Sequence, residues 1–265
     1  MSYDYAAKVV VVTGASSGIG RAAAVDLAGR GAIVCAVARR EQLLRELVES
    51  LPGEGHSHFV CDVADRAQIE ALAGHVSERH GRCDILINNA GISRHRPLLA
   101  DDALEALDSV MATNFFGAVA CTKALLPMLV EARPGHVVNI ASVAGRIPVS
   151  GNAAYTASKF ALVGWSEAMH SELRHQDVHV SSVEPGPVPT EGFPQRGMAG
   201  HPIYRLGLAS TDDVTKAIRD AIEKRKVRRT VPRPYYLAQL ARLIAPGPWR
   251  ALQDRVVAAR TRRDR

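Results

Sequence analysis

The stretch Lys8-Val9-Val10-Val11-Val12-Thr13-Gly14-Ala15-Ser16-Ser17-Gly18-Ile19-Gly20 decides the fold class of this 265-residue chain. Residues 8–13 form a continuous apolar, β-branched run, which is typical of a strand buried on both faces. Glycines follow this run directly, and the apolar positions of residues 19–29 have the spacing of a helix. A strand, a glycine turn and a helix in this order predict the first unit of a parallel sheet covered by helices.

The rest of the chain repeats the alternation of strand and helix. Because the strands are continuous Val/Ile runs, without a polar residue at every second position, we expect parallel strands joined by right-handed crossovers. The predicted fold class is therefore α/β: one doubly wound, Rossmann-type parallel sheet of about seven strands with helices on both faces, in a single domain spanning residues 1–265. The predicted strands cover residues 8–13, 33–38, 58–61, 84–87, 136–140, 178–183 and 227–231, and the predicted helices cover residues 19–29, 41–50, 66–80, 103–130, 153–174 and 212–226.

Composition narrows the class of protein. An apolar content of 47% fits a globular domain. The four cysteines, Cys35, Cys61, Cys83 and Cys121, form no CxxC pair, so we expect buried free thiols in a reducing cytosol and no metal site. The N-terminus lacks the basic and apolar regions of a signal peptide, and no run reaches the ~18–20 apolar residues of a membrane span. We therefore predict a cytoplasmic protein without a transmembrane helix.

The positive charge is concentrated near the C-terminus. Residues 216–265 hold fifteen Lys and Arg against four Asp and Glu, whereas the rest of the chain holds 18 against 23. The basic extension 234–265 is predicted to form one or two helices, and such a helix with an apolar face indicates contact with an anionic membrane, or packing against the domain or a partner subunit. No groove-reading motif accompanies the charge, so we expect no nucleic-acid binding. The apolar face of this helix collects Tyr236, Leu237, Leu240, Leu243 and Ile244, with Gln239 and Arg242 on the opposite face.

The glycine cluster predicts a dinucleotide site. Gly14, Gly18 and Gly20 have the spacing GxxxGxG, which differs from the usual GxGxxG. The physical requirement is the same in both cases. Glycines permit a tight turn and a close approach of the pyrophosphate, and the helix N-terminus presents free N–H groups and a positive dipole end.

The end of the second strand indicates which dinucleotide binds. An acidic residue there would accept the ribose hydroxyls of NAD, but Ala38 is followed by Arg39 and Arg40. Guanidinium groups are planar donors for a 2′-phosphate, so the sequence favours NADP(H) over NAD(H). The alternative is that both arginines start a helix and face water. After the third strand, Asp62 and Val63 border the adenine, or Asp62 caps the next helix.

Tyr155 and Lys159 lie four residues apart on a predicted helix and therefore share one face. A free tyrosine has a pKa of about 10, and a neighbouring ammonium group together with an oxidised nicotinamide lowers such a pKa. Ser142, which lies upstream, is placed to donate a hydrogen bond to the substrate oxygen on which negative charge builds. We therefore predict hydride transfer with Tyr155 as general acid/base. The alternative is that all three residues are structural, with Tyr155 and Lys159 on an amphipathic helix and Ser142 as a capping serine.

In these residues and their order, the chain resembles the short-chain dehydrogenase/reductase family in its common single-domain form. The resemblance covers residues 8 to about 190. It implies that Ser142 polarises the substrate oxygen, and that Lys159 both assists Tyr155 and binds the cofactor ribose. It implies that Asn114 anchors a water in a proton relay; the alternative is that Asn114 kinks its helix. The matching motifs are the glycine loop at 13–20, Asn88-Asn89-Ala90-Gly91, Asn114, the group Ser142, Tyr155 and Lys159, and Pro185-Gly186 with Thr190.

The resemblance also implies a cofactor site and an assembly. Asn89 and Gly91 would border the cofactor, and Thr190 would contact its carboxamide. A homodimer or homotetramer through the long helices is expected. Glu184 departs from the family pattern beside the nicotinamide, where many members carry a neutral or basic residue. The predicted cofactor set is Gly14, Ser16, Ser17, Gly18, Ile19, Gly20, Arg39, Arg40, Asp62, Val63, Asn89, Ala90, Gly91, Tyr155, Lys159, Pro185, Gly186, Val188 and Thr190.

The substrate pocket is predicted to be apolar. Its wall comes from residues 93–99, 143–152 and 185–204, where the five prolines and four glycines of residues 185–202 predict a loop. We take residues 186–206 as the substrate-loop region. The wall favours a lipophilic alcohol or ketone, such as a steroid, a retinoid or an acyl chain. Three basic residues, Arg94, His95 and Arg96, interrupt this apolar wall and are compatible with an anionic group on the substrate. The apolar wall residues are Ile92, Leu98, Val143, Ile147, Val149, Phe193, Met198 and Ile203.

The sequence therefore predicts an oxidoreductase that transfers a hydride between NADP(H) and a carbonyl or secondary alcohol. Two alternatives share the same fold: a catalytically silent dinucleotide-sensing module and a membrane-peripheral scaffold protein. Intact Ser142, Tyr155 and Lys159 argue against the sensing module, because a sensor has no need of an activated phenol.

Overall fold

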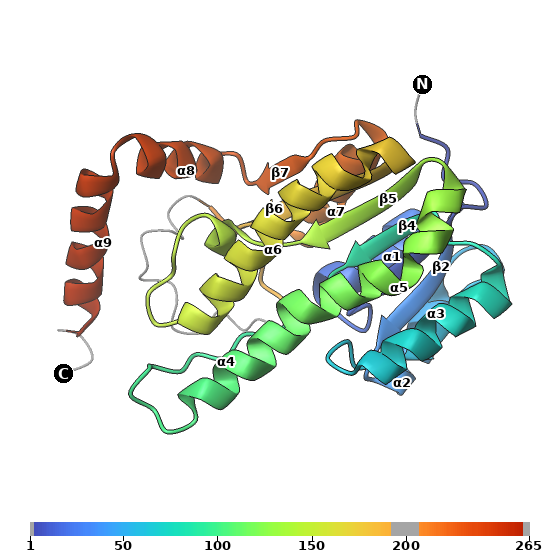
Figure 1. Ribbon diagram of the computed structural model, residues 1–265, viewed down its shortest axis with the longest axis horizontal. Coiled ribbons are helices and arrows are strands. Elements are labelled where there is room, and N and C mark those ends of the chain that lie inside the picture. Colours follow the sequence, from blue (N-terminus) through green and yellow to red (C-terminus); the bar gives the residue numbers. More distant parts are fainter. Residues whose placement is uncertain (1–2, 192–206, 262–265) are drawn as a thin grey trace.

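The computed structural model describes residues 3–191 and 207–261 of the chain. Its centre is a sheet of seven parallel strands in the order β3-β2-β1-β4-β5-β6-β7, with helices on both faces (Figure 1). This arrangement confirms the predicted doubly wound, Rossmann-type fold. The strands are β1 (Val9–Thr13), β2 (Ile33–Ala38), β3 (Ser57–Val60), β4 (Ile85–Asn88), β5 (Gly135–Ile140), β6 (Val178–Pro185) and β7 (Arg228–Val231).

The central strands β1, β2 and β4 are apolar at nearly every position because both faces of the sheet are covered. Along β1, Val10 and Val12 pack into the core on one face, whereas Val11 packs into the core on the other. Successive strand residues point to opposite faces, so a doubly covered sheet needs apolar residues at both. One face is covered by α1 (Gly18–Ala28), α2 (Glu41–Ser50) and α7 (Thr211–Glu223), and the other by α3 (Arg66–His80), α5 (Gly117–Ala132) and α6 (Ala153–Leu173).

The order of the strands places a crevice at the middle of the sheet. From β1 the chain moves outward to β2 and β3, and it then crosses to β4 on the other side of β1. The connections leave β1 and β4 in opposite directions, so the loops that follow Thr13 and Asn88 separate above the carboxyl ends of these strands. Such a switch point is where open α/β sheets bind ligands.

One predicted helix is divided, and some predicted strand ends are shifted. The segment predicted as a single helix at 103–130 consists of α4 (Ala103–Met111), a π-helical segment (Ala112–Phe116) and α5, with Asn114 in the middle of the π-helical segment. β3 starts one residue earlier than predicted, and β6 continues two residues further, to Pro185. Two short 3₁₀ turns, η2 (Val143–Gly145) and η3 (Arg174–Gln176), follow β5 and α6.

By length and composition, one helix among the described residues could cross a membrane. It is the continuous run Ala103–Ala132, with a mean hydropathy of 1.5, whereas we expected no such run from the sequence. Core helices of globular domains pass the same test, and α5 packs against α3 and β5 in the fold. The apolar character of this run is therefore weak evidence for a membrane span.

The C-terminal helices α8 (Pro234–Ile244) and α9 (Pro246–Thr261) extend beyond β7 at one end of the molecule (Figure 1). The face of α8 that meets the domain carries Tyr235 and Gln239, which are 0% and 4% exposed, whereas Leu243 and Ile244 are 71% and 82% exposed. Gln239 donates a hydrogen bond to buried Glu184, and Arg242 donates one to the Arg146 carbonyl. Docking of the apolar face against the domain, one alternative from the sequence, is therefore wrong, because a buried carboxylate attracts the polar face.

Candidate active site

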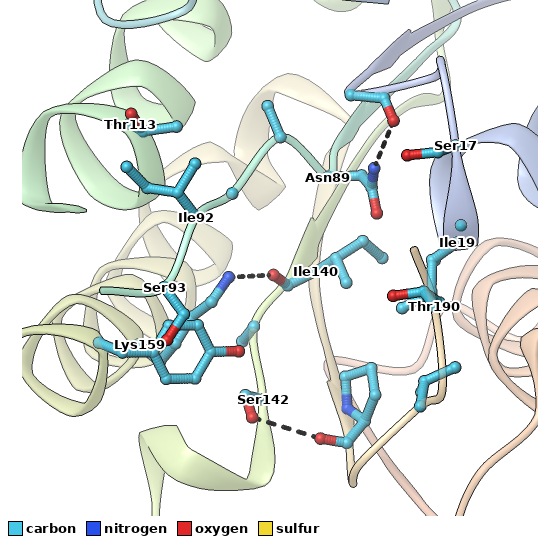
Figure 2. A pocket seen from close by; sticks show the side chains of 18 of the residues that line it. Ser17, Ile19, Asn89, Ile92, Ser93, Thr113, Ile140, Ser142, Lys159 and Thr190 are labelled. Carbon is cyan, nitrogen blue, oxygen red and sulfur yellow. Dashed lines mark hydrogen bonds between the residues drawn. The ribbon is translucent and has the colours of Figure 1, made fainter. Parts of the chain in front are cut away.

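A cavity of ≈ 690 Å³ lies at the carboxyl edge of the sheet, at the switch point (Figure 2). The loops after β1 to β6 and the N-terminal part of α6 line it. Gly20 and Asn114 lie behind its wall. The predicted site residues that line it are Gly14, Ser16, Ser17, Gly18, Ile19, Arg39, Arg40, Asp62, Val63, Asn89, Ala90, Gly91, Ser142, Tyr155, Lys159, Pro185, Gly186, Val188 and Thr190.

Hydrogen bonds across the switch point hold the glycine loop in place. The Thr13 hydroxyl accepts the N–H groups of Asn89, at 2.9 Å, and Ala90, at 3.1 Å. In return, Asn89 Nδ2 donates to the carbonyls of Thr13 and Gly14 (Figure 2). Asn89, a predicted cofactor residue, thus also joins the loops after β1 and β4 into one rigid edge of the cavity.

The glycines are required by close approach and by backbone conformation. Gly14 has φ +65° and Gly18 has φ +55°, a region that side chains disfavour. A Cβ at Gly20 would lie 2.4 Å from both the Gly14 carbonyl oxygen and Asn89 Nδ2. The loop therefore leads tightly into α1, whose N-terminus faces the cavity with no acidic residue in its first turn. Free N–H groups and the positive end of the helix dipole fit a pyrophosphate.

Arg40 is the N-cap residue of α2 and its side chain is 46% exposed, but its guanidinium is also bound to the glycine loop. Its Nη2 donates to Ser16 Oγ at 3.0 Å and to Ser17 Oγ at 2.7 Å. Its Nη1 lies 3.3 Å from Glu191 Oε1. These contacts place a guanidinium at the end of β2 in the cavity wall, where it is able to pair with a phosphate.

Asp62 lines the cavity and is not the cap of α3, which corrects one alternative from the sequence. The cap is Asp65, whose carboxylate accepts the N–H groups of Ala67 and Gln68 and keeps a lowered pKa through these bonds and that of the Gln68 side chain. Asp62 instead forms an exposed ion pair with Arg39 at 3.4 Å. Each arginine at the end of β2 therefore has one carboxylate partner, and Arg40 is the stronger candidate for a phosphate because it also contacts the glycine loop.

Ser142, Tyr155 and Lys159 meet on the wall opposite the glycine loop. Lys159 is 4% exposed, donates to the Ile140 carbonyl at 2.8 Å, and has its Nζ 5.6 Å from the centroid of the Tyr155 ring (Figure 2). Burial lowers the pKa of Lys159 to about 8. The Ser142 hydroxyl accepts the Ala144 N–H and lies 3.4 Å from the Pro185 carbonyl, so it caps η2 and also faces the cavity.

Asn114 is buried behind the catalytic group and pins two elements together. Its Oδ1 accepts the Ile92 N–H at 2.8 Å, and its Nδ2 donates to the Ile92 carbonyl and to Ser158 Oγ. A Cβ added at Gly91 would lie 3.3 Å from Asn114 Oδ1 and 3.7 Å from Lys159 Nζ. Asn114 thus holds the loop after β4 against α6, and its π-helical backbone fits the alternative of a helix distortion.

The apolar wall is smaller than the sequence suggested. Ile92, Val143 and Val149 line the cavity, but Ile147 is buried in the fold and Leu98 is 86% exposed. Phe193, Met198 and Ile203 lie outside the described residues.

Asn152 ends the wall segment 143–152 that the sequence predicted, but its polar role in the cavity was not predicted. It is 3% exposed, lines the cavity, and donates to Ser93 Oγ at 2.8 Å. Within residues 3–191 and 207–261 its buried Oδ1 accepts no hydrogen bond. A polar residue directly before α6 is the sequence signal that was available.

Glu184, the departure from the family pattern, stays out of the cavity wall. Its fully buried carboxylate accepts hydrogen bonds from Arg146, Arg228, Thr230 and Gln239. The carboxylate therefore ties β6 to β7, α8 and the end of η2, and it does not narrow the cavity.

Comparison with known proteins supports the class that this fold and site define. The family model of the short chain dehydrogenases matches residues 8–198, and the chain belongs to this family of oxidoreductases. It is 36% identical to the mouse (Mus musculus) protein Dehydrogenase/reductase SDR family member 7B, over 97% of this chain and 82% of the relative. It is 38% identical to a farnesol dehydrogenase of Aedes aegypti, over 81% of this chain and 89% of the relative.

Two solved structures have the same fold with different dinucleotides. A short-chain dehydrogenase/reductase from Burkholderia phymatum in complex with NAD has a TM-score of 0.79 and 27% identity, covering 91% of this chain and 94% of its own. A short-chain dehydrogenase from Burkholderia cenocepacia in complex with NADP has a TM-score of 0.78 and 26% identity, covering 96% and 99%. The likeness supports a nucleotide cofactor and leaves the choice between the two open.

The packing around Gly20 gives a first testable prediction. Gly20→Ala would force the loop apart, at a cost of about 1–3 kcal/mol. We expect a lower free energy of unfolding in urea and weaker dinucleotide binding in a fluorescence titration. Gly74→Ala in α3 is the matched control: its added Cβ meets nothing within 4 Å, so it should be neutral or stabilise by about 0.5–1 kcal/mol. Equal behaviour of both variants would contradict the tight loop.

Proposed function

We propose that this protein is an NADP(H)-dependent short-chain dehydrogenase/reductase that interconverts a carbonyl and a secondary alcohol. One observation carries the proposal: Ser142, Tyr155 and Lys159 line the same cavity as the glycine loop, on its opposite wall. The nicotinamide, when bound, supplies or accepts the hydride. The residues of the chain supply the proton and the electrostatic stabilisation.

Each of the three residues has a separate task in the reduction of a carbonyl. The Tyr155 hydroxyl donates its proton to the substrate oxygen as that oxygen gains electron density. The Ser142 hydroxyl donates a hydrogen bond to the same oxygen. Lys159, still largely protonated at neutral pH with a pKa of about 8, stabilises the phenolate that remains. In the oxidation of an alcohol, the phenolate takes the proton back.

Asn114 is proposed to support the return of protons to Tyr155. It lies next to Gly91, as does the Lys159 ammonium, on the buried side of the catalytic group. A water held in this region would link the ammonium to solvent. The family resemblance supports this relay, and the hydrogen bonds of Asn114 to Ile92 and Ser158 keep the region ordered.

The substrate is proposed to be lipophilic. The part of the wall nearest the catalytic group includes Ile92, Val143 and Val149, and one relative is named a farnesol dehydrogenase. The buried Oδ1 of Asn152 would accept a hydrogen bond from a donor on the substrate. The alternative of a catalytically silent sensing module makes a different prediction for turnover, which the following experiment separates.

Substitution of Tyr155 tests the mechanism. Tyr155→Phe removes the proton donor, and loss of general acid catalysis is expected to lower kcat about 10²–10⁴-fold while NADPH still binds. The measurement is NADPH absorbance with a panel of lipophilic ketones and aldehydes. Tyr236→Phe on α8 is the matched control and should keep wild-type turnover. Wild-type protein that binds NADPH tightly but turns over no member of the panel would favour the sensing module.

Arg40 tests the choice of cofactor. Hydrogen bonds to charged groups contribute about 1.5–3 kcal/mol, so Arg40→Ala should weaken NADPH binding by roughly 10–150-fold and NADH binding far less. Dissociation constants for both dinucleotides are measured by fluorescence. Arg45→Ala, an exposed helical arginine paired with Glu41, is the control and should change neither. Tighter binding of NADH than NADPH by the wild type would refute the NADP(H) proposal.

A second proposal concerns the position of the protein in the cell: peripheral contact of α8 with an anionic membrane on the cytoplasmic side. The polar face of α8 is held against the domain, and its outer face exposes Leu237, Leu243 and Ile244 at 67–82%. Basic residues follow in α9, including Arg250 and Arg255. An apolar face beside positive charge fits an anionic lipid surface.

The membrane proposal is tested by liposome flotation. We expect the protein to float with vesicles that contain an anionic lipid, and the double variant Leu237→Asp/Leu243→Asp to stay with the soluble fraction. Val25→Asp, at a 41% exposed position on α1, is the control and should float like the wild type. Turnover of the double variant should be unchanged. Flotation that is absent, or that is independent of anionic lipid, would remove the proposal.

A further inference from the structure

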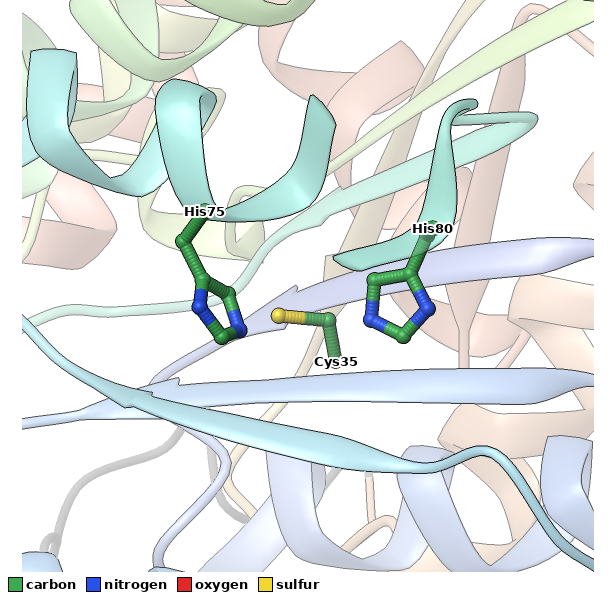
Figure 3. Close-up of side chains that lie close together, drawn as sticks. All are labelled: Cys35, His75 and His80. Carbon is green, nitrogen blue, oxygen red and sulfur yellow. The ribbon is translucent and has the colours of Figure 1, made fainter. Parts of the chain in front are cut away.

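Three side chains with metal-binding atoms converge far from the cavity, between β2 and α3. Cys35 comes from β2, and His75 and His80 come from α3; in Figure 3 the Cys35 sulfur lies between the two imidazole rings. The Cys35 sulfur and one nitrogen of each ring all lie within 4.8 Å of one another. Cys35 is fully buried and the two histidines are partly exposed, so an ion can reach the cluster from solvent.

A fourth group points to the same position. Ser57 pairs with Cys35 in the parallel register of β2 and β3. Its Oγ lies 2.8 Å from His80 Nε2 and 3.3 Å from His75 Nε2. Both Nε2 atoms therefore face a common centre, with one sulfur and one hydroxyl oxygen beside them.

The fold explains why these residues meet. Cys35 and Ser57 point to the face of the sheet that α3 covers, because Cys35 packs in the same core as Val37, two residues further along β2. His80 is the last residue of α3, next to the left-handed cap Gly81. The histidines are five residues apart, a spacing that does not match the i, i+4 pairs of helical metal motifs. The sequence therefore predicted no metal site.

We propose that Cys35, His75 and His80 bind one Zn²⁺ ion, with Ser57 Oγ or a water as the fourth ligand. One thiolate and two imidazoles are a ligand set that Zn²⁺ prefers, in tetrahedral geometry. Bonds of about 2.0–2.3 Å require each ligand atom to move inward by less than about 1 Å. On binding, the Cys35 thiol loses its proton to solvent and forms the Zn–S bond, while each neutral imidazole contributes a lone pair.

The electrostatic surroundings are compatible with this exchange. Burial lowers the pKa of His75 and of His80, so both rings are neutral at pH 7 and keep a free lone pair. Burial raises the pKa of Cys35 to about 11, so the thiol keeps its proton until a cation replaces it. The ion would clip α3 onto β2 and β3. This site lies toward the amino end of β2, whereas the catalytic cavity lies beyond its carboxyl end, so the inference is independent of the proposed reaction.

Cobalt spectroscopy on the full-length, tag-free protein, freed of metal with a chelator, tests the site. We expect one equivalent of Co²⁺ to produce a thiolate-to-cobalt charge-transfer band and the intense visible bands of a tetrahedral ion, and Zn²⁺ to displace them. Cys35→Ser and His80→Gln should weaken binding at least as much as loss of an outer-shell partner does, about 10–100-fold. His175→Gln is the matched control, because this exposed histidine lies on η3, which follows α6 and precedes β6, four strands from β2 in the sheet.

Thermal unfolding and X-ray absorption complete the test. Zn²⁺ should raise the Tm of the wild type and of His175→Gln, and leave that of Cys35→Ser unchanged, since the ion binds the folded state. X-ray absorption of wild-type protein with one equivalent of Zn²⁺ should show one sulfur and two imidazole ligands, which keeps the test valid if a variant fails to fold. A zinc shell without sulfur, or equal Co²⁺ affinity of wild type and Cys35→Ser, would overturn the proposal.

Discussion

The hydrogen bonds between Thr13 and the segment Asn89–Ala90 are the interaction on which the site depends. The sheet brings β1 and β4 side by side, but the strand order turns their connections in opposite directions, and a crevice opens between them. The Thr13 hydroxyl and the Asn89 amide close the base of that crevice with four hydrogen bonds between the two loops. The glycine loop, the α1 N-terminus and the wall that carries Lys159 then face each other across a fixed gap.

Burial of a few polar groups sets the geometry of the opposite wall. Lys159 is buried to 4% exposure, and it is held by the Ile140 carbonyl at the end of β5, so its ammonium sits where the sheet ends and α6 begins. Asn114 fills the space behind Lys159. It lies in a π-helical segment, and a regular α-helix there would turn the side chain of residue 114 in a different direction. The position of the Lys159 ammonium near Tyr155 thus depends on the packing of α6, β5 and the π-helical segment against one another. No single element determines it.

A buried polar group also determines how the C-terminal helix α8 is oriented, and here the result is an exposed apolar surface. Glu184 is buried beneath the cavity and collects donors from β7, η2 and α8. An unpaired carboxylate in that position would be costly, so the polar side of α8 turns inward and its leucines turn outward. The orientation of α8, and with it the apolar surface proposed to meet a membrane, is therefore tied to one buried side chain.

Patterns in the sequence were sufficient for the sheet, the glycine loop and the Tyr155–Lys159 helix, because buried parallel strands and i, i+4 spacing are local properties of the chain. The tertiary structure alone decided the rest. The pairing of Arg40 with Ser16 and Ser17, the burial of Gln239 and the burial of Asn152 in the cavity wall depend on residues distant in the sequence. The cluster of Cys35, His75 and His80 likewise arises only when α3 packs on β2, since neither spacing nor composition records which faces of two elements will meet.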